Sequence, residues 1–266
     1  MRTTTKRFNE KNGKALIVGR VILDFGLDMK AHRKKEDKWK AHKDWVAKEF
    51  LGNRKAYFDR LSKIIERAKD EGVELLVFPA CAMIRHNTSH ARRYRTLFRG
   101  ISCVAGGVLS VTTRRGMQRY RESAGIWIEG RQALKLNSDA ARGVSLPRVH
   151  ILAAISSTIG QVADPKMGHL EALTGLADSK RVLVMDMGHH QYSGRYLRTL
   201  RRVWMRVRDA SHKRTVVVLA FWKYLGTKSE TRWMEPKKGR RQKFERHRIP
   251  LSIDRSREDF LDVIRF

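Results

Sequence analysis

The chain has 266 residues, of which 57 are Lys or Arg and 27 are Asp or Glu, so its formal net charge is +30. A hydrophobic fraction of 41% is enough to build a core, which excludes a wholly disordered chain. Two cysteines exclude a disulfide scaffold and a cysteine-rich zinc module, and the charge excess predicts a polyanionic partner.

The first predicted elements alternate between strand and helix. Residues 15–23 are apolar and predict a strand, whereas the charge-rich residues 30–48 predict an exposed helical or irregular insertion. The clearest helix covers residues 54–71, because its apolar side chains fall on one face at helical spacing. Asn53 can cap the start of this helix, and Gly72 can end it in a left-handed conformation.

The following segments predict mostly buried strands. An apolar run at 73–78 before Pro79 is typical of a strand buried on both faces, and the run at 101–111 contains Gly106 and Gly107, which predict a bulge or a close backbone approach. Glu129-Gly130-Arg131 predicts a hairpin turn. The remaining expected elements are strands at 149–155, 181–187 and 215–222, helices at 165–178 and 195–209, and a short helix or strand at 257–266.

The order of these elements predicts one α/β domain over residues 15–222. A basic arm at residues 1–14 and a basic extension at 223–266 flank it. No segment has the ~20 mostly apolar residues of a membrane-spanning helix, and no cleavage site follows the first apolar stretch. A cytoplasmic location without membrane contact is therefore expected.

The stretch AYFDRLSKIIERAKDEGVELLVFPA, residues 56–80, resembles the nitrilase (carbon–nitrogen hydrolase) superfamily. In that superfamily a helix ending at a Gly leads to an apolar strand that finishes in Phe-Pro-Glu. The resemblance extends more weakly over residues 15–222. It implies a nitrilase-like four-layer α-β-β-α sandwich and a possible homodimer. It also implies a Glu base, a Lys and a Cys nucleophile that act on an amide or nitrile carbon.

The catalytic positions that the resemblance marks are Ala80, Lys135 and Ala154. Alanine can neither take a proton nor attack a carbon, so the base and the nucleophile are missing and no catalytic residue is expected at these places. If the resemblance holds, Ala80, Lys135 and residues 153–156 should lie around one cavity.

A relocated site would need other reactive side chains. The candidates are Cys81, Cys103, Glu122, Glu129, Ser156, Ser157, Asp186, His189 and His190. The simpler interpretations are buried small residues for the cysteines, caps for the serines, and surface or loop positions for the others. No third metal ligand follows at diagnostic spacing, so neither a metal nor a cofactor is expected.

Basic residues gather in three groups that lack acidic neighbours. The first is the helix face formed by Arg195, Arg198, Arg202 and Arg206. The second is the tail run that includes Lys237, Lys238, Arg240 and Arg241. The third is Arg85, Arg92, Arg93, Arg95 and Arg99. Such surfaces favour DNA or RNA as the partner, and Trp39, Trp45, Trp222 and Trp233 are interpreted either as base-stacking side chains or as loop anchors.

Three hypotheses follow from the sequence. The first is a nitrilase-like binding or scaffold protein without amidase or nitrilase activity and with a nucleic-acid-binding surface. The second is an active carbon–nitrogen hydrolase of the same fold with a relocated site. The third is an unrelated α/β enzyme of nucleic acids.

Overall fold

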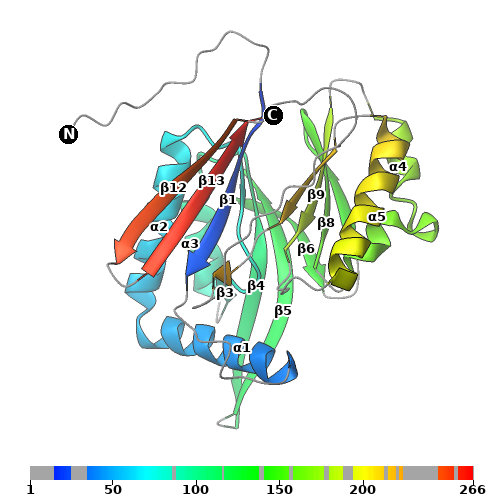
Figure 1. Ribbon diagram of the computed structural model, residues 1–266. Helices are drawn as coiled ribbons and strands as arrows, with labels where there is room; N and C mark the ends of the chain where they lie inside the picture. Colours follow the sequence, from blue (N-terminus) through cyan, green and yellow to red (C-terminus); the bar gives the residue numbers. More distant parts are fainter. Residues whose placement is uncertain are drawn as a thin grey trace.

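Two β-sheets lie face to face, as Figure 1 shows for the computed structural model. The larger sheet has the order β12-β13-β1-β2-β4-β5-β6, with β11 beside β1 and β3 beside β4, and the smaller has the order β10-β9-β8-β7. The structure describes residues 15–24, 35–85, 88–115, 117–137, 141–155, 158–176, 180–187, 194–212, 215–219, 222–223, 245–254 and 257–265.

Each sheet combines parallel and antiparallel pairs. The strands of the larger sheet are β1 (Ile17–Asp24), β2 (Leu75–Val77), β3 (Met83–Arg85), β4 (Cys103–Arg114), β5 (Met117–Ile128), β6 (Arg131–Asn137), β11 (Trp222–Lys223), β12 (Glu245–Asp254) and β13 (Arg257–Arg265). Those of the smaller sheet are β7 (Arg142–Ser145), β8 (Val149–Ala154), β9 (Arg181–Asp186) and β10 (Thr215–Leu219). The β1–β2–β4 and β8–β9–β10 ladders are parallel, whereas the β4–β5–β6 ladder is antiparallel.

Apolar side chains fill the space between the two sheets. The larger sheet contributes Val18, Leu75, Val77, Cys103, Ala105, Ala124 and Ile126, and the smaller contributes Val149, Ile151, Ala153, Leu183 and Met185. At roughly 25 cal/mol per Å² of apolar surface removed from water, this layer is a main source of folding free energy.

Helices cover both outer faces. α1 (Lys35–Gly52), α2 (Arg54–Asp70) and α3 (Thr88–Leu97) bury side chains against the larger sheet, and α5 (Gly194–Ser211) buries Leu200, Val203 and Val207 against the smaller one. The four layers are therefore α-β-β-α, and the fold class predicted from the sequence is confirmed.

Local signals predicted several elements correctly. The side chain of Asn53 caps α2 by accepting a hydrogen bond from the backbone N of Ala56 at 3.0 Å, and Gly72 is left-handed with φ of +68°. Glu129 and Gly130 form the turn between β5 and β6 with φ of +50° and +75°, as the hairpin prediction requires.

Two predicted segments need correction. Residues 165–178 do not form one helix, because the left-handed Gly168 ends the short 3₁₀ turn at Pro165–Met167, and one α-turn, α4 (Glu171–Thr174), follows it. A separate 3₁₀ turn at Ile159–Ala163 precedes the segment. The charge-rich segment at 30–48 is helical from Lys35, as one of the two predicted alternatives has it, but it is not simply exposed, since α1 buries Val46 and Ala47 in the core.

The C-terminal strands belong to the larger sheet. β13 lies between β12 and β1, and Ile17–Ile22 pair antiparallel with Phe260–Arg265. The larger sheet therefore extends beyond residue 222, where the sequence placed the end of the domain, and includes strands within 245–265. The arm at 1–14 and residues 224–244 of the extension lie outside the described residues.

Candidate functional site

Ala80 sits where the chain crosses over β4 between β2 and β3. The backbone N of Gly107 donates a hydrogen bond to the carbonyl of Pro79 at 3.2 Å, and a Cβ atom at Gly107 would lie 2.5 Å from Cα of Ala80. The close approach predicted for Gly106 and Gly107 is confirmed, because any larger residue at 107 would push the crossing segment away. Ala80 is fully buried and offers no reactive atom.

Lys135 and Ala154 lie on opposite sides of the sandwich. The side chain of Lys135 is exposed on β6 and lines a small pocket with Tyr94 and Trp127, on the helix-covered face of the larger sheet. Ala154 is buried in the cluster beneath α5, on the far face of the smaller sheet. The prediction that these positions surround one cavity is therefore wrong for Lys135 and Ala154, and Ser156 lies outside the described residues.

Cys81, Glu122 and Lys43 form a second candidate site, which combines a thiol, a carboxyl and an ammonium group. Cys81 is fully buried with φ of +56°, and its backbone N would lie 2.7 Å from a Cβ at Gly107. Glu122 on β5 pairs with Leu109, so it shares a sheet face with Gly107 on the neighbouring strand. Burial raises the pKa of the Cys81 thiol well above its usual value, the Glu122 carboxylate raises it further, and Lys43 of α1 lowers it.

The chemistry open to this group is limited. The Cys81 thiol stays protonated, and the thiolate is the nucleophilic form. Burial also raises the pKa of the partly buried Glu122 to about 7, although Lys43 opposes the shift. Cys103 is simpler still, since burial in the inter-sheet core raises its pKa to about 12. Neither cysteine is poised to attack a carbon atom.

Glu122 should make stability depend on pH. Its folded-state pKa of about 7 lies above the ordinary value of 4.5, so the folded state holds the proton more tightly and stability falls as the pH rises from about 4.5 to about 7. We expect Glu122→Gln to raise the urea midpoint at pH 8 and to change it little at pH 4. The exposed control Glu66→Gln should show no such contrast. An equal gain for Glu122→Gln at both pH values would contradict the prediction.

The other predicted candidates are structural or lie outside the described residues. Asp186 is buried at the end of β9, where its carboxylate accepts a hydrogen bond from the Tyr196 hydroxyl. Glu129 is exposed in the hairpin turn. Ser156, Ser157, His189 and His190 are not described. Within the described part of the chain, no three His, Cys, Asp or Glu side chains lie close enough to hold a metal ion.

The outer side of α5 carries exposed arginines, which we call the α5 arginine face: Arg198, Arg201, Arg202 and Arg206. Arg206 also donates a hydrogen bond to the carbonyl of Ala163 at 2.9 Å. The one acidic residue of the helix, Asp209, pairs with Arg208 at 2.6 Å. Over the described residues, no carboxylate pairs with Arg198, Arg201 or Arg202, so their charge faces solvent.

Other members of the predicted basic surface are not placed. The side chain of Arg195 and the tail residues Lys237, Lys238, Arg240 and Arg241 lie outside the described part. Of the four tryptophans, only the side chain of Trp45 is described, and it packs against the core, which fits an anchor rather than a base-stacking platform.

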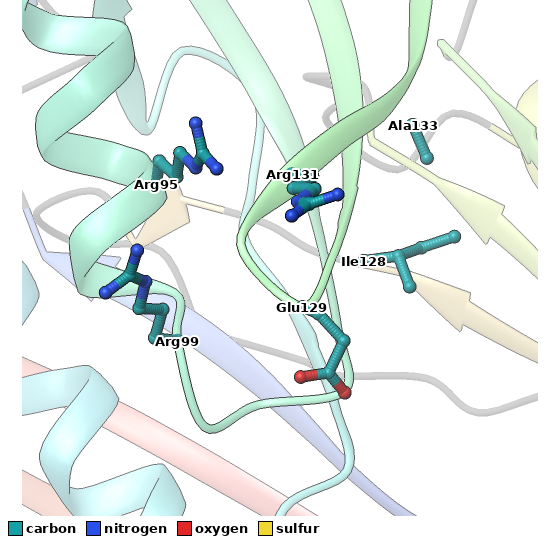
Figure 2. A pocket seen from close by; sticks show the side chains of 6 residues that line it. All are labelled: Arg95, Arg99, Ile128, Glu129, Arg131 and Ala133. Atoms are coloured by element: carbon teal, nitrogen blue, oxygen red, sulfur yellow. The ribbon is translucent and has the colours of Figure 1, made fainter.

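A second basic site lies between the end of α3 and the β5–β6 hairpin. A cavity of about 450 Å³, which we call the arginine pocket, is lined by Arg95, Arg99, Ile128, Glu129, Arg131 and Ala133 (Figure 2). A Cβ at Gly130 would lie 2.5 Å from the carbonyl O of Arg95, so the hairpin tip rests on the end of α3. This contact brings Arg131 beside Arg95 and Arg99.

The sequence identified only part of this pocket. Arg95 and Arg99 were expected to form a basic cluster, but nothing local links them to Arg131. The turn at Glu129-Gly130 was the available signal, since it fixes the hairpin whose tip carries Arg131. No carboxylate of the described residues forms an ion pair with Arg95, Arg99 or Arg131.

Comparisons with known proteins show a similarity between this chain and solved structures in fold only. No protein-family model and no curated protein matches the chain. Among solved structures, the glutamine-dependent NAD⁺ synthetase from Acinetobacter baumannii in complex with ADP aligns with a TM-score of 0.43 and 11% identity over 78% of this chain and 38% of that one. The glutamine-dependent NAD⁺ synthetase from Cytophaga hutchinsonii aligns with a TM-score of 0.42 and 9% identity over 81% of this chain and 37% of that one.

A third solved structure is a CN-hydrolase superfamily protein from Xanthomonas campestris, with a TM-score of 0.38 and 8% identity over 79% of this chain and 76% of that one. The chain thus spans less than two-fifths of the length of either synthetase. Similarities at these scores carry no argument for a function. None of the helices in the described residues is long and apolar enough to cross a membrane.

Proposed function

We propose that this protein binds nucleic acid through the phosphate backbone and does not hydrolyse amides or nitriles with a thiol. The observation that supports the proposal is the α5 arginine face, whose guanidinium groups are exposed and whose helix holds a single acidic residue. With a formal net charge of +30, the chain also has few carboxylates to neutralise such a face.

The physical basis is the release of counterions. Each phosphate that an arginine neutralises frees a condensed cation, and the resulting entropy favours binding without regard to base sequence. α5 is well suited to hold these arginines, because Leu200, Val203 and Val207 fix its opposite face in the core. The guanidinium groups therefore share one side of a helix that binding does not have to order.

The test is a pair of matched double variants. We expect Arg198→Gln with Arg202→Gln to make the slope of log K against log salt less steep by about two units. Each lost phosphate contact removes about one unit from its magnitude. The control is Lys55→Gln with Lys63→Gln on α2, which removes the same charge from exposed positions of a helix that also carries acidic residues. Arg206 is left unchanged because it bonds to Ala163.

Fluorescence anisotropy with labelled single-stranded DNA and RNA of mixed sequence would measure both slopes. Absence of binding to either nucleic acid at 50 mM salt would overturn the proposal. Equal slopes for the α5 variant and the α2 control would remove α5 from the interface.

A second candidate function is hydrolysis at a relocated site. The left-handed backbone of Cys81 favours it, because non-glycine residues with positive φ cluster at active sites. Glu122 and Lys43 also lie within electrostatic reach of the thiol. Against it stand the full burial of Cys81 and the raised pKa of its thiol.

We expect no thiol-dependent turnover of simple amides or nitriles. The measurement is product release from a panel of aliphatic amides and nitriles at pH 8, with wild-type protein and with Cys81→Ala. Release that is present in the wild type and lost in Cys81→Ala would establish the hydrolase instead. Cys103→Ala serves as the matched control, since that thiol is also buried.

A further inference from the structure

We infer that the arginine pocket binds the phosphate monoester at the end of a nucleic-acid strand. The inference deepens the proposed function and rests on it. It begins from a set of side chains that two separate elements bring together. Arg95 comes from the last turn of α3, Arg99 from the turn that follows the helix, and Arg131 from the start of β6. Figure 2 shows the guanidinium groups of Arg95 and Arg131 on facing sides of the space between helix and hairpin.

The charge of the pocket matches a dianion. Three arginines and one glutamate line it, which leaves two positive charges (3 − 1 = 2). A phosphate monoester carries about −1.5 to −2 at pH 7, because its second pKa is near 6. A phosphodiester inside a strand carries a single negative charge. Guanidinium groups also suit phosphate geometry, since their planar forks donate two parallel hydrogen bonds to its oxygens.

The shape of the pocket favours a strand end over a strand interior. The contact between Gly130 and the Arg95 carbonyl joins the hairpin tip to the helix, so a strand cannot pass between the two elements at that point. A volume of about 450 Å³ lies in the range of small-molecule sites, roughly 300–1,000 Å³, and exceeds what a bare phosphate needs.

The lining divides the pocket into two parts. In Figure 2 Arg95 and Arg99 lie on one side, Ile128 and Ala133 lie on the other, and Arg131 lies between them. The arginines form the part that would hold the phosphate. The apolar side chains offer a surface to the sugar or base that follows it. Such an arrangement binds a terminal nucleotide without reading its sequence.

The experiment compares short strands that differ only at their ends. Ten-nucleotide single strands of one sequence would carry a 5′-phosphate, a 3′-phosphate or two hydroxyl ends, and their affinities would be measured at 100 mM salt and pH 7.5. We expect at least one phosphorylated end to bind about tenfold more tightly than the hydroxyl strand, because charge-assisted hydrogen bonds are the strong ones. The preference should shrink at pH 5.5, where the monoester takes up a proton.

The double variant Arg95→Gln with Arg131→Gln should bind phosphorylated and hydroxyl strands with about equal affinity. The α2 control Lys55→Gln with Lys63→Gln should keep the preference for the phosphorylated strand. Arg99→Gln provides a second variant if the double variant unfolds at a lower temperature than the wild type. Direct binding of a labelled nucleoside monophosphate, compared with the nucleoside and with the phosphorylated strands, tells a strand end from a free nucleotide. Binding of the monophosphate without any binding of strands would assign the pocket to free nucleotides and overturn the strand-end partner.

The remaining outcomes separate the inference from the proposed function. Equal affinity for phosphorylated and hydroxyl strands would overturn the pocket assignment and leave nucleic-acid binding standing. A preference that survives in the Arg95, Arg131 double variant would also overturn it. Failure of every strand to bind, at low as well as moderate salt, would overturn nucleic-acid binding itself.

Discussion

Raising the salt concentration from 50 to 200 mM is expected to weaken nucleic-acid binding by ~10³–10⁵, if about six to ten phosphates are contacted. The cause is that released counterions gain less entropy when the solution already holds more of them. The formal net charge of +30 and the exposed α5 arginine face supply enough cations for a contact of this size. Equilibrium titrations at four or more salt concentrations would give the slope of log K against log salt.

The same titration can locate the contact. A steep slope that Arg198→Gln with Arg202→Gln leaves unchanged would move the interface to the tail or to the insertion at 30–48. In the first case the slope of log K against log salt should become less steep when Gln replaces Lys237, Lys238, Arg240 and Arg241. A salt dependence of less than tenfold over the same range would contradict binding through several phosphates.

Short-range signals explain which parts of the fold were predictable from sequence. α2 depends on its own residues, with Asn53 at its start, Gly72 after its end and apolar spacing between them. The β5–β6 turn is equally local, because Glu129 and Gly130 adopt the left-handed conformations that such a turn needs. The failed helix at 165–178 shows the same rule, since Gly168 adopts a left-handed conformation and ends the turn that begins at Pro165.

The sites depend on contacts between distant residues, and these were harder to predict. The side on which Lys135 lies could be predicted from its neighbours. It stands between Leu134 and Leu136 on one strand, and Leu136 packs between the sheets. Strand alternation therefore directs Lys135 to the opposite face, away from the core that holds Ala153. The arginine pocket had no such signal, since the contact of Gly130 with Arg95 comes from packing of a hairpin on a helix.

Arg20 is the plainest case of a residue explained only by a distant partner. It interrupts an apolar strand in the sequence, yet it is 0% exposed. Its Nη2 lies 2.5 Å from Oδ2 of Asp262, which is also 0% exposed and sits directly opposite on β13. Nε of Arg248 on β12 lies 2.7 Å from the other oxygen of the same carboxylate. A single aspartate thus holds two arginines from the strands on either side.

Asp262→Ala is expected to lower the free energy of unfolding by about 3–5 kcal/mol, because it leaves the charge of Arg20 buried without its carboxylate. That is a large part of the 5–15 kcal/mol typical of a domain, so the variant should unfold at a much lower urea concentration. Arg248→Gln is the matched control and should cost under about 1 kcal/mol, since its side chain is 34% exposed. The double variant Arg20→Met with Asp262→Leu should recover most of the loss, because apolar side chains of similar volume often replace a buried ion pair without cost. Urea unfolding followed by circular dichroism would rank the four proteins, and a loss for Asp262→Ala no larger than for Arg248→Gln would contradict this account of the buried pair.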